Sequence, residues 1–283
     1  MKPQFHLPLS TYPDASSFTI IDNAIDLTWQ NDAHLVASIP QVRVPQAHQS
    51  FPTAIDVDTW RGQAERYSRD SGTSLREHLT YAVSETRIQT RIHGFEATEP
   101  FVYERFSEIA RCHDLSIIEA SEVSRQFSET LLFGSGRPLV LFPATSVCSR
   151  VDMIAVAWDG SATAARALSC ARIFFERDQG AGHLDPDDKQ IDEVNRALLI
   201  SSSKYSGLDV ENVSIQARGE TAAAAIQSAA LERKADLLVA GGFGHSRLRE
   251  FILGGVTREL LVRAELPVLL ARHAADGRRL TRS

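Results

Sequence analysis

Apolar residues are distributed along the chain in two alternating patterns. Short apolar runs bounded by aspartate, glycine or proline are typical of buried strands. Apolar residues spaced three or four apart are typical of amphipathic helices. In the N-terminal half these patterns predict strands over residues 5–9, 34–39, 87–93, 114–118 and 138–142, and helices over residues 18–29, 53–86, 101–110 and 123–132. Strands that alternate with helices in this way indicate a parallel sheet with helices on both faces.

Turn and cap signals divide the N-terminal half further. Ser16 is expected to cap the first helix. Pro40 marks a loop after the second strand, and Ser71-Gly72 marks a break in the long helical segment. Gly134-Ser135-Gly136 follows the last helix of this half. We interpret it as a C-cap turn rather than a binding loop.

The C-terminal half repeats the alternation. Its predicted strands are residues 153–157, 210–216, 237–240 and 267–270, and its predicted helices are residues 162–175, 185–203, 221–233 and 256–264. Ser10 matches Asp159 at an offset of 149 residues, whereas Asp114 matches Asp236 at an offset of 122. The second half is therefore 27 residues shorter between its first and fourth strands. Residues 176–186 show no β-like run, so we expect a second sheet of either five strands or four.

Composition and charge restrict the class of protein. A chain of 283 residues with 43% hydrophobic and 23% charged residues is expected to form two soluble domains. We expect domains at residues 1–146 and 151–273 and a flexible tail at 274–283. The N-terminus has no signal-peptide pattern, and no run is apolar enough to cross a membrane. Three cysteines without metal or redox spacing predict buried thiols in a reducing cytoplasm. The net charge of −6 argues against a nucleic-acid partner.

A glycine-rich stretch follows the strand predicted at 237–240. It consists of Gly241-Gly242-Phe243-Gly244, an arm over residues 245–253, and Gly254-Gly255 at the start of a helix. Glycines let a ligand approach bare backbone. The first amides of a helix lack intrahelical partners and favour phosphate. The stretch therefore predicts a phosphate-binding loop, and the alternative is that these glycines only form a turn and a helix entry.

This arrangement resembles the nucleotide site of the universal stress protein family, whose pattern is Gly-x2-Gly-x9-Gly-(Ser/Thr). Gly241, Gly244 and Gly254 fit the spacing, and Gly255 stands where the ATP-binding members usually have Ser or Thr. The resemblance implies an adenine nucleotide alpha-hydrolase-like α/β fold in two tandem domains. It also implies ATP, with Mg²⁺, as the ligand. The ligand-binding residues that it implies are Ala157 and Asp159 on the adenine side, Ala240, Gly241 and Gly244 facing ribose and phosphate, and the amides of Gly254, Gly255 and Val256 on phosphate.

Asp159 and Gly255 each have a second interpretation. In Asp159-Gly-Ser161, either end could instead cap the following helix. Gly255 lacks a hydroxyl, and a hydrogen bond to a charged group contributes about 1.5–3 kcal/mol, so its absence weakens binding roughly ten- to a hundredfold. Thr257 or Ser246 could supply a hydroxyl instead.

Other polar residues near the glycine stretch carry weaker signals. His245 could act as a catalyst, but a loop residue that packs locally explains it as well. Arg247 and Arg249 could reach an anion or could be solvated charges on the arm. The chain has no Gly-Lys-(Ser/Thr) phosphate loop, no Gly-x-Ser-x-Gly elbow and no metal-ligand spacing. We therefore expect no catalytic residues and no metal site, and at most very slow ATP hydrolysis.

The N-terminal half lacks the glycine loop. Glu119-Ala-Ser-Glu122 stands where Ala240-Gly-Gly-Phe243 stands in the second half, and its carboxylates would repel phosphate. We therefore expect a degenerate, structural first domain. By resemblance, residues 139–141 and 268–270 could pair at their sheet edges into a pseudo-dimer within one chain, with or without a further homodimer. Two functions remain open, an ATP-binding stress protein and a nucleotide-free interaction protein with an unknown protein partner.

Overall fold

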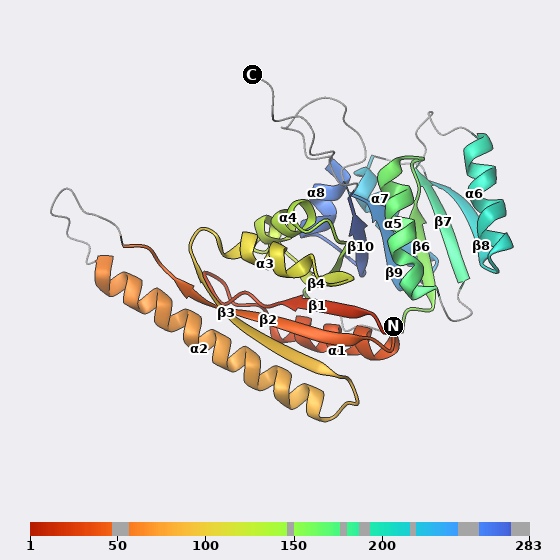
Figure 1. Cartoon of the computed structure of the whole chain (residues 1–283). Helices are drawn as coiled ribbons and strands as arrows, with labels where there is room; N and C mark the ends of the chain where they lie inside the picture. Colours follow the sequence, from red (N-terminus) through yellow and green to blue (C-terminus); the bar gives the residue numbers. More distant parts are fainter. Residues whose placement is uncertain are drawn as a thin grey trace, which may run out of the picture. The chain divides into compact units, whose positions relative to one another are not determined.

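The computed structural model describes residues 1–46, 57–145, 150–175, 180–186, 193–215, 219–242 and 255–272 (Figure 1). The chain divides into two compact units. The N-terminal unit is Met1–Arg150 with Leu261–Pro267, and the C-terminal unit is Val151–Leu260 with Val268–Ser283. Each unit alternates strands with helices, which confirms the predicted α/β class with two tandem domains.

The N-terminal unit contains one parallel sheet with the strand order β3-β2-β1-β4-β5. Helices α1 and α2 lie on one face of the sheet, and α3 and α4 lie on the other (Figure 1). The elements are β1 (Gln4–Pro8), α1 (Phe18–Gln30), β2 (His34–Arg43), α2 (Val57–Ser84), β3 (Thr90–Thr98), α3 (Val102–Ala110), β4 (Leu115–Ala120), α4 (Arg125–Gly134) and β5 (Leu139–Pro143).

The C-terminal unit repeats this layout with the strand order β10-β9-β6-β7-β8, also parallel. The elements are β6 (Met153–Ala157), α5 (Ala162–Ala171), a 3₁₀ turn (Arg172–Phe174), β7 (Gly180–Pro186), α6 (Glu193–Tyr205), β8 (Asp209–Ile215), α7 (Ala222–Glu232), β9 (Leu237–Gly241), α8 (Gly255–Val262) and β10 (Val268–Ala271).

In each unit an aspartate just before the fourth strand binds the backbone at the start of the first strand. Asp114 accepts a hydrogen bond from the backbone amide of Gln4 at 2.8 Å, which joins the start of β4 to the start of β1. Asp236 accepts from the amides of Asp152 and Met153, both at 2.9 Å, and joins β9 to β6. The match between these two aspartates is therefore a match of structural role as well as of sequence.

The sheet of the C-terminal unit has five strands, not four. Residues 180–186 form β7, which pairs with β6 on one side and β8 on the other. The expectation of no strand over residues 176–186 was therefore wrong. The helix predicted to begin at residue 185 was also wrong at residues 185 and 186, which belong to β7. The shortening lies mainly in the crossover that follows. Residues 44–89 join β2 to β3, whereas only residues 187–208 join β7 to β8.

The long helix α2 runs unbroken from Val57 to Ser84, although a break was predicted near Gly72. Gly72 faces β2, where a Cβ would lie in ordinary contact at 3.4 Å from Cγ2 of Ile39. Pro40 lies inside β2 rather than in a loop. It follows Ser38, where the pairing of β2 with β1 ends, so one side of the strand is open at Pro40.

Smaller differences concern a cap, a strand boundary and a thiol. Ser17, not Ser16, caps α1, with its Oγ accepting from the amide of Ile20. The third strand begins at Thr90, three residues later than predicted. Cys112 is exposed rather than buried, and Cys148 lies outside the described residues.

The turn after α4 has the predicted form, with Gly136 at φ +68°. No helix among the described residues could cross a membrane.

Candidate functional site

The carboxyl ends of β6 and β9 lie side by side in the C-terminal unit (Figure 1). Ala157 pairs with Ala240 at the last position of this register. On the other side of β9, Ala240 pairs with Leu270, and the amide of Gly242 donates to the carbonyl of Ala271 at 2.8 Å. In open parallel sheets a ligand crevice lies beyond such strand ends. The fold therefore brings together the two strand ends that carry the predicted Ala157, Asp159, Ala240 and Gly241.

The turn after β6 is braced by its own side chains. Oδ1 of Asp159 accepts from the amide of Ser161 at 2.9 Å, and Gly160 has φ +72°. Oγ of Ser161 accepts from the amide of Ala164 at 3.1 Å, so Ser161 is the N-cap of α5. Of the two residues that could cap the helix, Ser161 is therefore the cap. Asp159 holds the turn that precedes the helix.

Gly241 has a packing role that is independent of any ligand. A Cβ at this position would lie 2.6 Å from the amide nitrogen of Ala164 and 2.8 Å from the carbonyl carbon of Thr163. Real Cβ atoms essentially never approach other atoms so closely. The first turn of α5 therefore lies directly on the backbone of Gly241, and only glycine fits there without a shift of that turn.

Gly255 is exposed at the start of α8, and a Cβ there would meet no heavy atom within 4 Å. The amides of Gly255 and Val256 belong to the first turn of this helix and lack intrahelical acceptors. Thr257, proposed as a substitute hydroxyl, is buried with 4% of its surface exposed. The remaining residues of the predicted loop and arm lie outside the described residues: Gly244, His245, Ser246, Arg247, Arg249 and Gly254.

Trp158 was missed by the sequence reasoning. Its indole Nε1 is buried and has no hydrogen-bond partner in the part of the chain that the structure describes. An unsatisfied buried donor typically costs about 1–3 kcal/mol, so it requires an explanation. The sequence signal was an aromatic residue between Ala157 and Asp159, at the end of a strand predicted to face the ligand.

In the N-terminal unit, the position that corresponds to Gly241 carries a carboxylate. Phe5 pairs with Leu115 as Ile154 pairs with Leu237, so Glu119 takes the position of Gly241. The comparison of the two loops had set Glu119 one residue earlier, against Ala240. The hydroxyl of Ser17 donates to Oε2 of Glu119, at the N-terminus of α1. A carboxylate is favoured at a helix N-terminus, so Glu119 has a structural role here.

A cavity of about 270 Å³ lies beside Glu119 at the carboxyl ends of β1 and β4. Its lining includes Asp14, Tyr103 and Ser124. Burial raises the pKa of Tyr103, and the nearby carboxylates of Glu99 and Asp14 raise that pKa further. Negative charge therefore surrounds this crevice, which disfavours an anionic ligand. Among the described residues, no three His, Cys, Asp or Glu side chains are grouped so that they could hold a metal ion.

Comparison with models of protein families matches residues 150–272 to the Universal stress protein family. A universal stress protein from Archaeoglobus fulgidus DSM 4304 has a similar structure, with a TM-score of 0.69 at 17% identity, and the likeness covers 97% of both chains. A functionally unknown protein from Pseudomonas aeruginosa PAO1 is similar with a TM-score of 0.56 at 12% identity, over 94% of this chain and 92% of that one. No curated protein matches the sequence.

These likenesses agree with the organisation of the two units. The family model covers the C-terminal unit, which carries the glycine stretch. The structural likeness covers both units and shows that they share the family's fold. Residues 150–272 thus match the universal stress protein family, and the chain as a whole has the fold of a universal stress protein of known structure.

Proposed function

We propose that the C-terminal unit binds ATP, with Mg²⁺, at the carboxyl ends of β6 and β9, and that the protein acts in a stress response without efficient catalysis. The observation that carries this proposal is the register of Ala157 with Ala240. It sets the braced Asp159 turn beside the strand end from which the glycine stretch begins. Nucleotide-sized ligands bind at such strand ends in open parallel sheets.

The adenine side would be formed by Ala157 and the turn after it. Ala157 is small and half-buried, so it leaves room for a ring above the strand end. Asp159 is held in place through its bond to the amide of Ser161. The unpartnered indole N–H of Trp158 supplies a donor next to this turn, and a ligand acceptor would satisfy it.

The phosphate side would be formed by the glycine stretch and the start of α8. Backbone amides at a helix N-terminus favour negative charge, and Gly255 and Val256 supply such amides. Gly244 and Gly254 belong to the same proposal by their spacing. Because Gly255 has no hydroxyl, we expect weaker binding than a serine would give at this position.

A second candidate function is an interaction protein without a physiological nucleotide. The close approach of Ala164 to Gly241 favours it, because this packing explains the glycine without a ligand. The missing hydroxyl at Gly255 points the same way.

Calorimetric titration of the full, nucleotide-free chain with ATP and Mg²⁺ separates the two functions. The proposal predicts one site per chain, which lies in the C-terminal unit. Ala157→Leu should then weaken ATP binding by filling the adenine side, whereas Glu119→Gln at the matching place in the N-terminal unit should leave it unchanged. Equal effects of the two substitutions would contradict the assignment to the C-terminal unit.

A further inference from the structure

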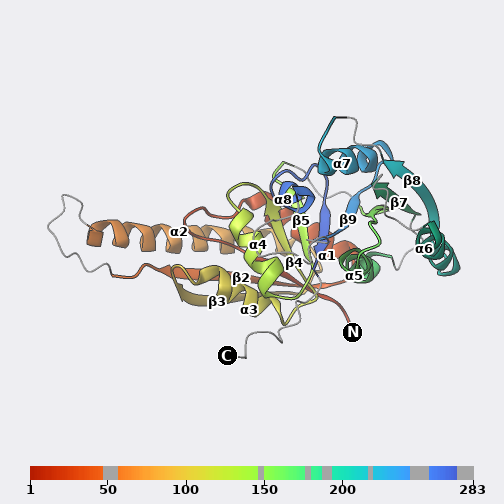
Figure 2. The ribbon, with the colours of Figure 1, turned by 90° about the horizontal axis from the view of Figure 1, so that it is seen from above.

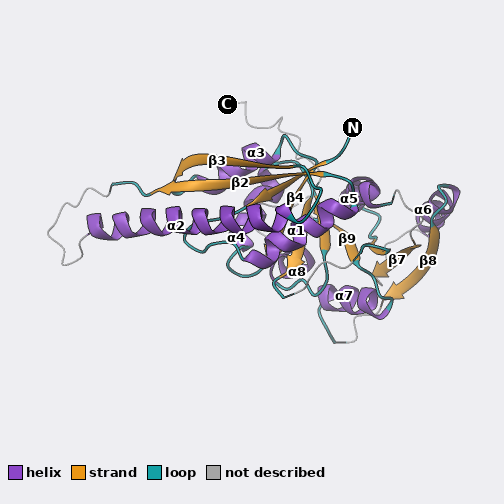
Figure 3. Ribbon diagram, turned by 90° about the horizontal axis from the view of Figure 1, so that it is seen from below, coloured by secondary structure: helices purple, strands orange, loops and turns teal. Residues whose placement is uncertain are grey.

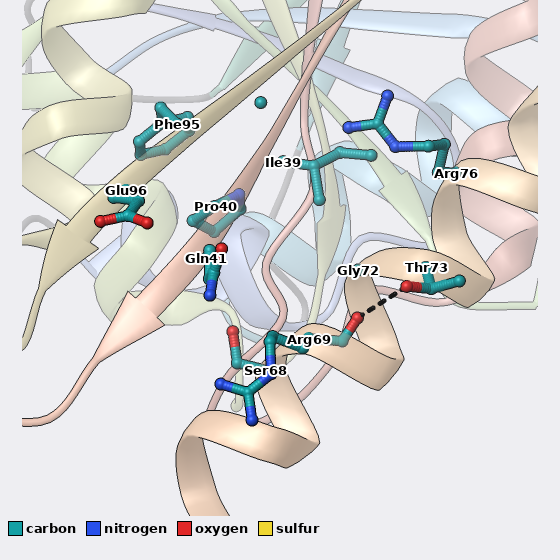
Figure 4. Close-up of a pocket in the computed structure, with 11 residues that line it drawn as sticks. Ile39, Pro40, Gln41, Ser68, Arg69, Gly72, Thr73, Arg76, Phe95 and Glu96 are labelled. Atoms are coloured by element: carbon teal, nitrogen blue, oxygen red, sulfur yellow. Dashed lines mark hydrogen bonds between the residues drawn. The ribbon is translucent and has the colours of Figure 1, made fainter.

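A groove of about 510 Å³ lies in the N-terminal unit between helix α2 and the outer strands β2 and β3 (Figure 4). Ser68, Arg69, Thr73 and Arg76 line it from the helix. Figure 4 shows these side chains opposite the strand residues, which include Pro40, Gln41, Phe95 and Glu96. The groove shares no lining residue with the cavity beside Glu119, so the two are separate features of the N-terminal unit.

The groove arises from a local extension of the fold. The five residues of β1 pair with His34–Ser38, so residues 39–43 of β2 pair with β3 beyond the end of β1. Helix α2 runs along this two-stranded extension (Figures 2 and 3). In the C-terminal unit the matching helix α6 has 13 residues, against 28 in α2. The groove thus belongs to a feature that is specific to the N-terminal unit.

The walls of the groove are held in place by buried contacts. Oγ of Ser68 accepts from the amide of Val42 at 3.0 Å and shares a hydrogen bond of 2.8 Å with Oγ1 of Thr11. Ser68 is fully buried, so this link fixes α2 against β2. Gly72 faces Ile39 of β2 at the same helix–strand interface. The groove is therefore preformed and does not need a ligand to order it.

Arg43, the last residue of β2, forms ion pairs with a carboxylate on α2 and a carboxylate on β3. Its guanidinium donates to Glu65 on α2 at 3.4 Å and to Glu96 on β3 at 3.2 Å. This bridge ties the helix to the edge strand. Glu96 is the carboxylate that lines the groove, and its negative charge is paired with the guanidinium of Arg43.

The other charges in the groove are positive and available. Among the described residues, the guanidinium groups of Arg69 and Arg76 have no hydrogen-bond acceptor and no carboxylate partner. The two residues are seven positions apart, so their Cα atoms are separated by about 10 Å along the helix. A Cβ at Gly94 would lie 3.3 Å from Nη2 of Arg76, so this glycine leaves the guanidinium room beside β3.

We propose that this groove binds a small organic anion that carries phosphate or carboxylate groups at two positions, one for Arg69 and one for Arg76. Guanidinium groups form bidentate, charge-assisted hydrogen bonds with both kinds of anion. Ile39, Pro40 and Phe95 provide apolar contact for the part of the ligand between its charged groups. The site is independent of the proposed ATP site in the other unit.

The test uses the full chain and two probes, inorganic tripolyphosphate and citrate, titrated by calorimetry at about 0.1 M salt, where distant charges are screened. Arg69→Gln and Arg76→Gln remove the proposed contacts and preserve helix propensity. Arg66→Gln is the matched control, because Arg66 is exposed on the same helix and does not line the groove. Circular dichroism on all three variants shows whether α2 is intact.

We expect at least one probe to bind, with a Kd about tenfold weaker in Arg69→Gln and in Arg76→Gln and unchanged in Arg66→Gln. The probe that binds more tightly identifies phosphate or carboxylate as the preferred group. The proposal is overturned if neither probe binds at millimolar concentration. It is equally overturned if Arg66→Gln weakens binding as much as the other two, since the attraction would then be non-specific.

Discussion

Gly241 lies directly beneath the backbone of Ala164, so that a Cβ on Gly241 would be 2.6 Å from the amide nitrogen of Ala164. The strand β9 and the helix α5 meet here without an intervening side chain. Gly241, which the family resemblance places beside ribose and phosphate, is therefore needed for the packing of α5 on β9 even without a ligand.

Gly241→Ala should destabilise the C-terminal unit whether or not nucleotide is present. The methyl group must displace the first turn of α5, and overpacking of this kind typically costs about 1–3 kcal/mol. Urea unfolding monitored by circular dichroism measures the change in the free energy of unfolding. Gly255→Ala is the matched control, since its Cβ meets nothing and should leave stability unchanged or raise it slightly. Equal stability of Gly241→Ala and the wild type would contradict the packing role.

Gly255→Ser should tighten ATP binding about ten- to a hundredfold, because the new hydroxyl can donate to phosphate. The site has room for the side chain, and the helix start tolerates serine. Gly255→Ala separates the effect of the hydroxyl from that of the added carbon. An increase in affinity that is the same for serine and alanine would argue against a hydrogen bond to phosphate.

Trp158→Phe should weaken ATP binding about two- to tenfold, since a neutral hydrogen bond contributes about 0.5–1.5 kcal/mol. Without nucleotide, the same substitution should leave the free energy of unfolding unchanged or raise it, because it removes a buried donor that has no partner. The two measurements together test whether the indole N–H serves the ligand. A loss of stability with no change in affinity would assign Trp158 to the core alone.

Stability should fall in acid through His6. This buried imidazole is hydrogen-bonded to Ser38 at 2.6 Å and Ser116 at 3.0 Å, and it stacks on His113 at 4.9 Å. Burial, together with the nearby His113 and His93, lowers the pKa of His6 to about 3. The unfolded state therefore takes up this proton first as the pH falls below about 6.5.

As the pH falls from 6.5 to about 3, His6 should lower the free energy of unfolding by about 1.4 kcal/mol for each pH unit of acidification. Urea unfolding at pH 7 and pH 5 measures the slope, and NMR of the imidazole assigns it. A His6 ring that titrates near pH 6.5 in the folded protein would refute this assignment.

The parts of the fold that follow local rules were predictable from the sequence. Strand β9 follows from a short-range apolar pattern, and the sequence limited the cap of α5 to Asp159 or Ser161. Strand β7 does not, because Gly-Ala-Gly-His-Leu-Asp-Pro has weak strand propensity and pairs with strands on both sides that are distant in sequence. The break predicted near Gly72 was also wrong, since α2 continues through this residue and packs there against the distant Ile39.

The candidate site was predictable in part. The neighbouring ends of β6 and β9 are as expected from the fold, and Ala157 and Ala240 meet there. The strand register matches Glu119 with Gly241, in agreement with the offset between Asp114 and Asp236, whereas the comparison of the two loops had set Glu119 against Ala240. The groove at Arg69 and Arg76 depends on how far two strands extend past their neighbour, and no local pattern encodes that.

The central claim is that the C-terminal unit is a working nucleotide site, and calorimetric titration of the nucleotide-free chain with ATP and Mg²⁺ tests it most directly. We predict saturable binding with one site per chain at roughly micromolar strength. No heat of binding up to millimolar ATP, in the wild type and in Gly255→Ser alike, would contradict the claim and leave the protein as a nucleotide-free interaction module.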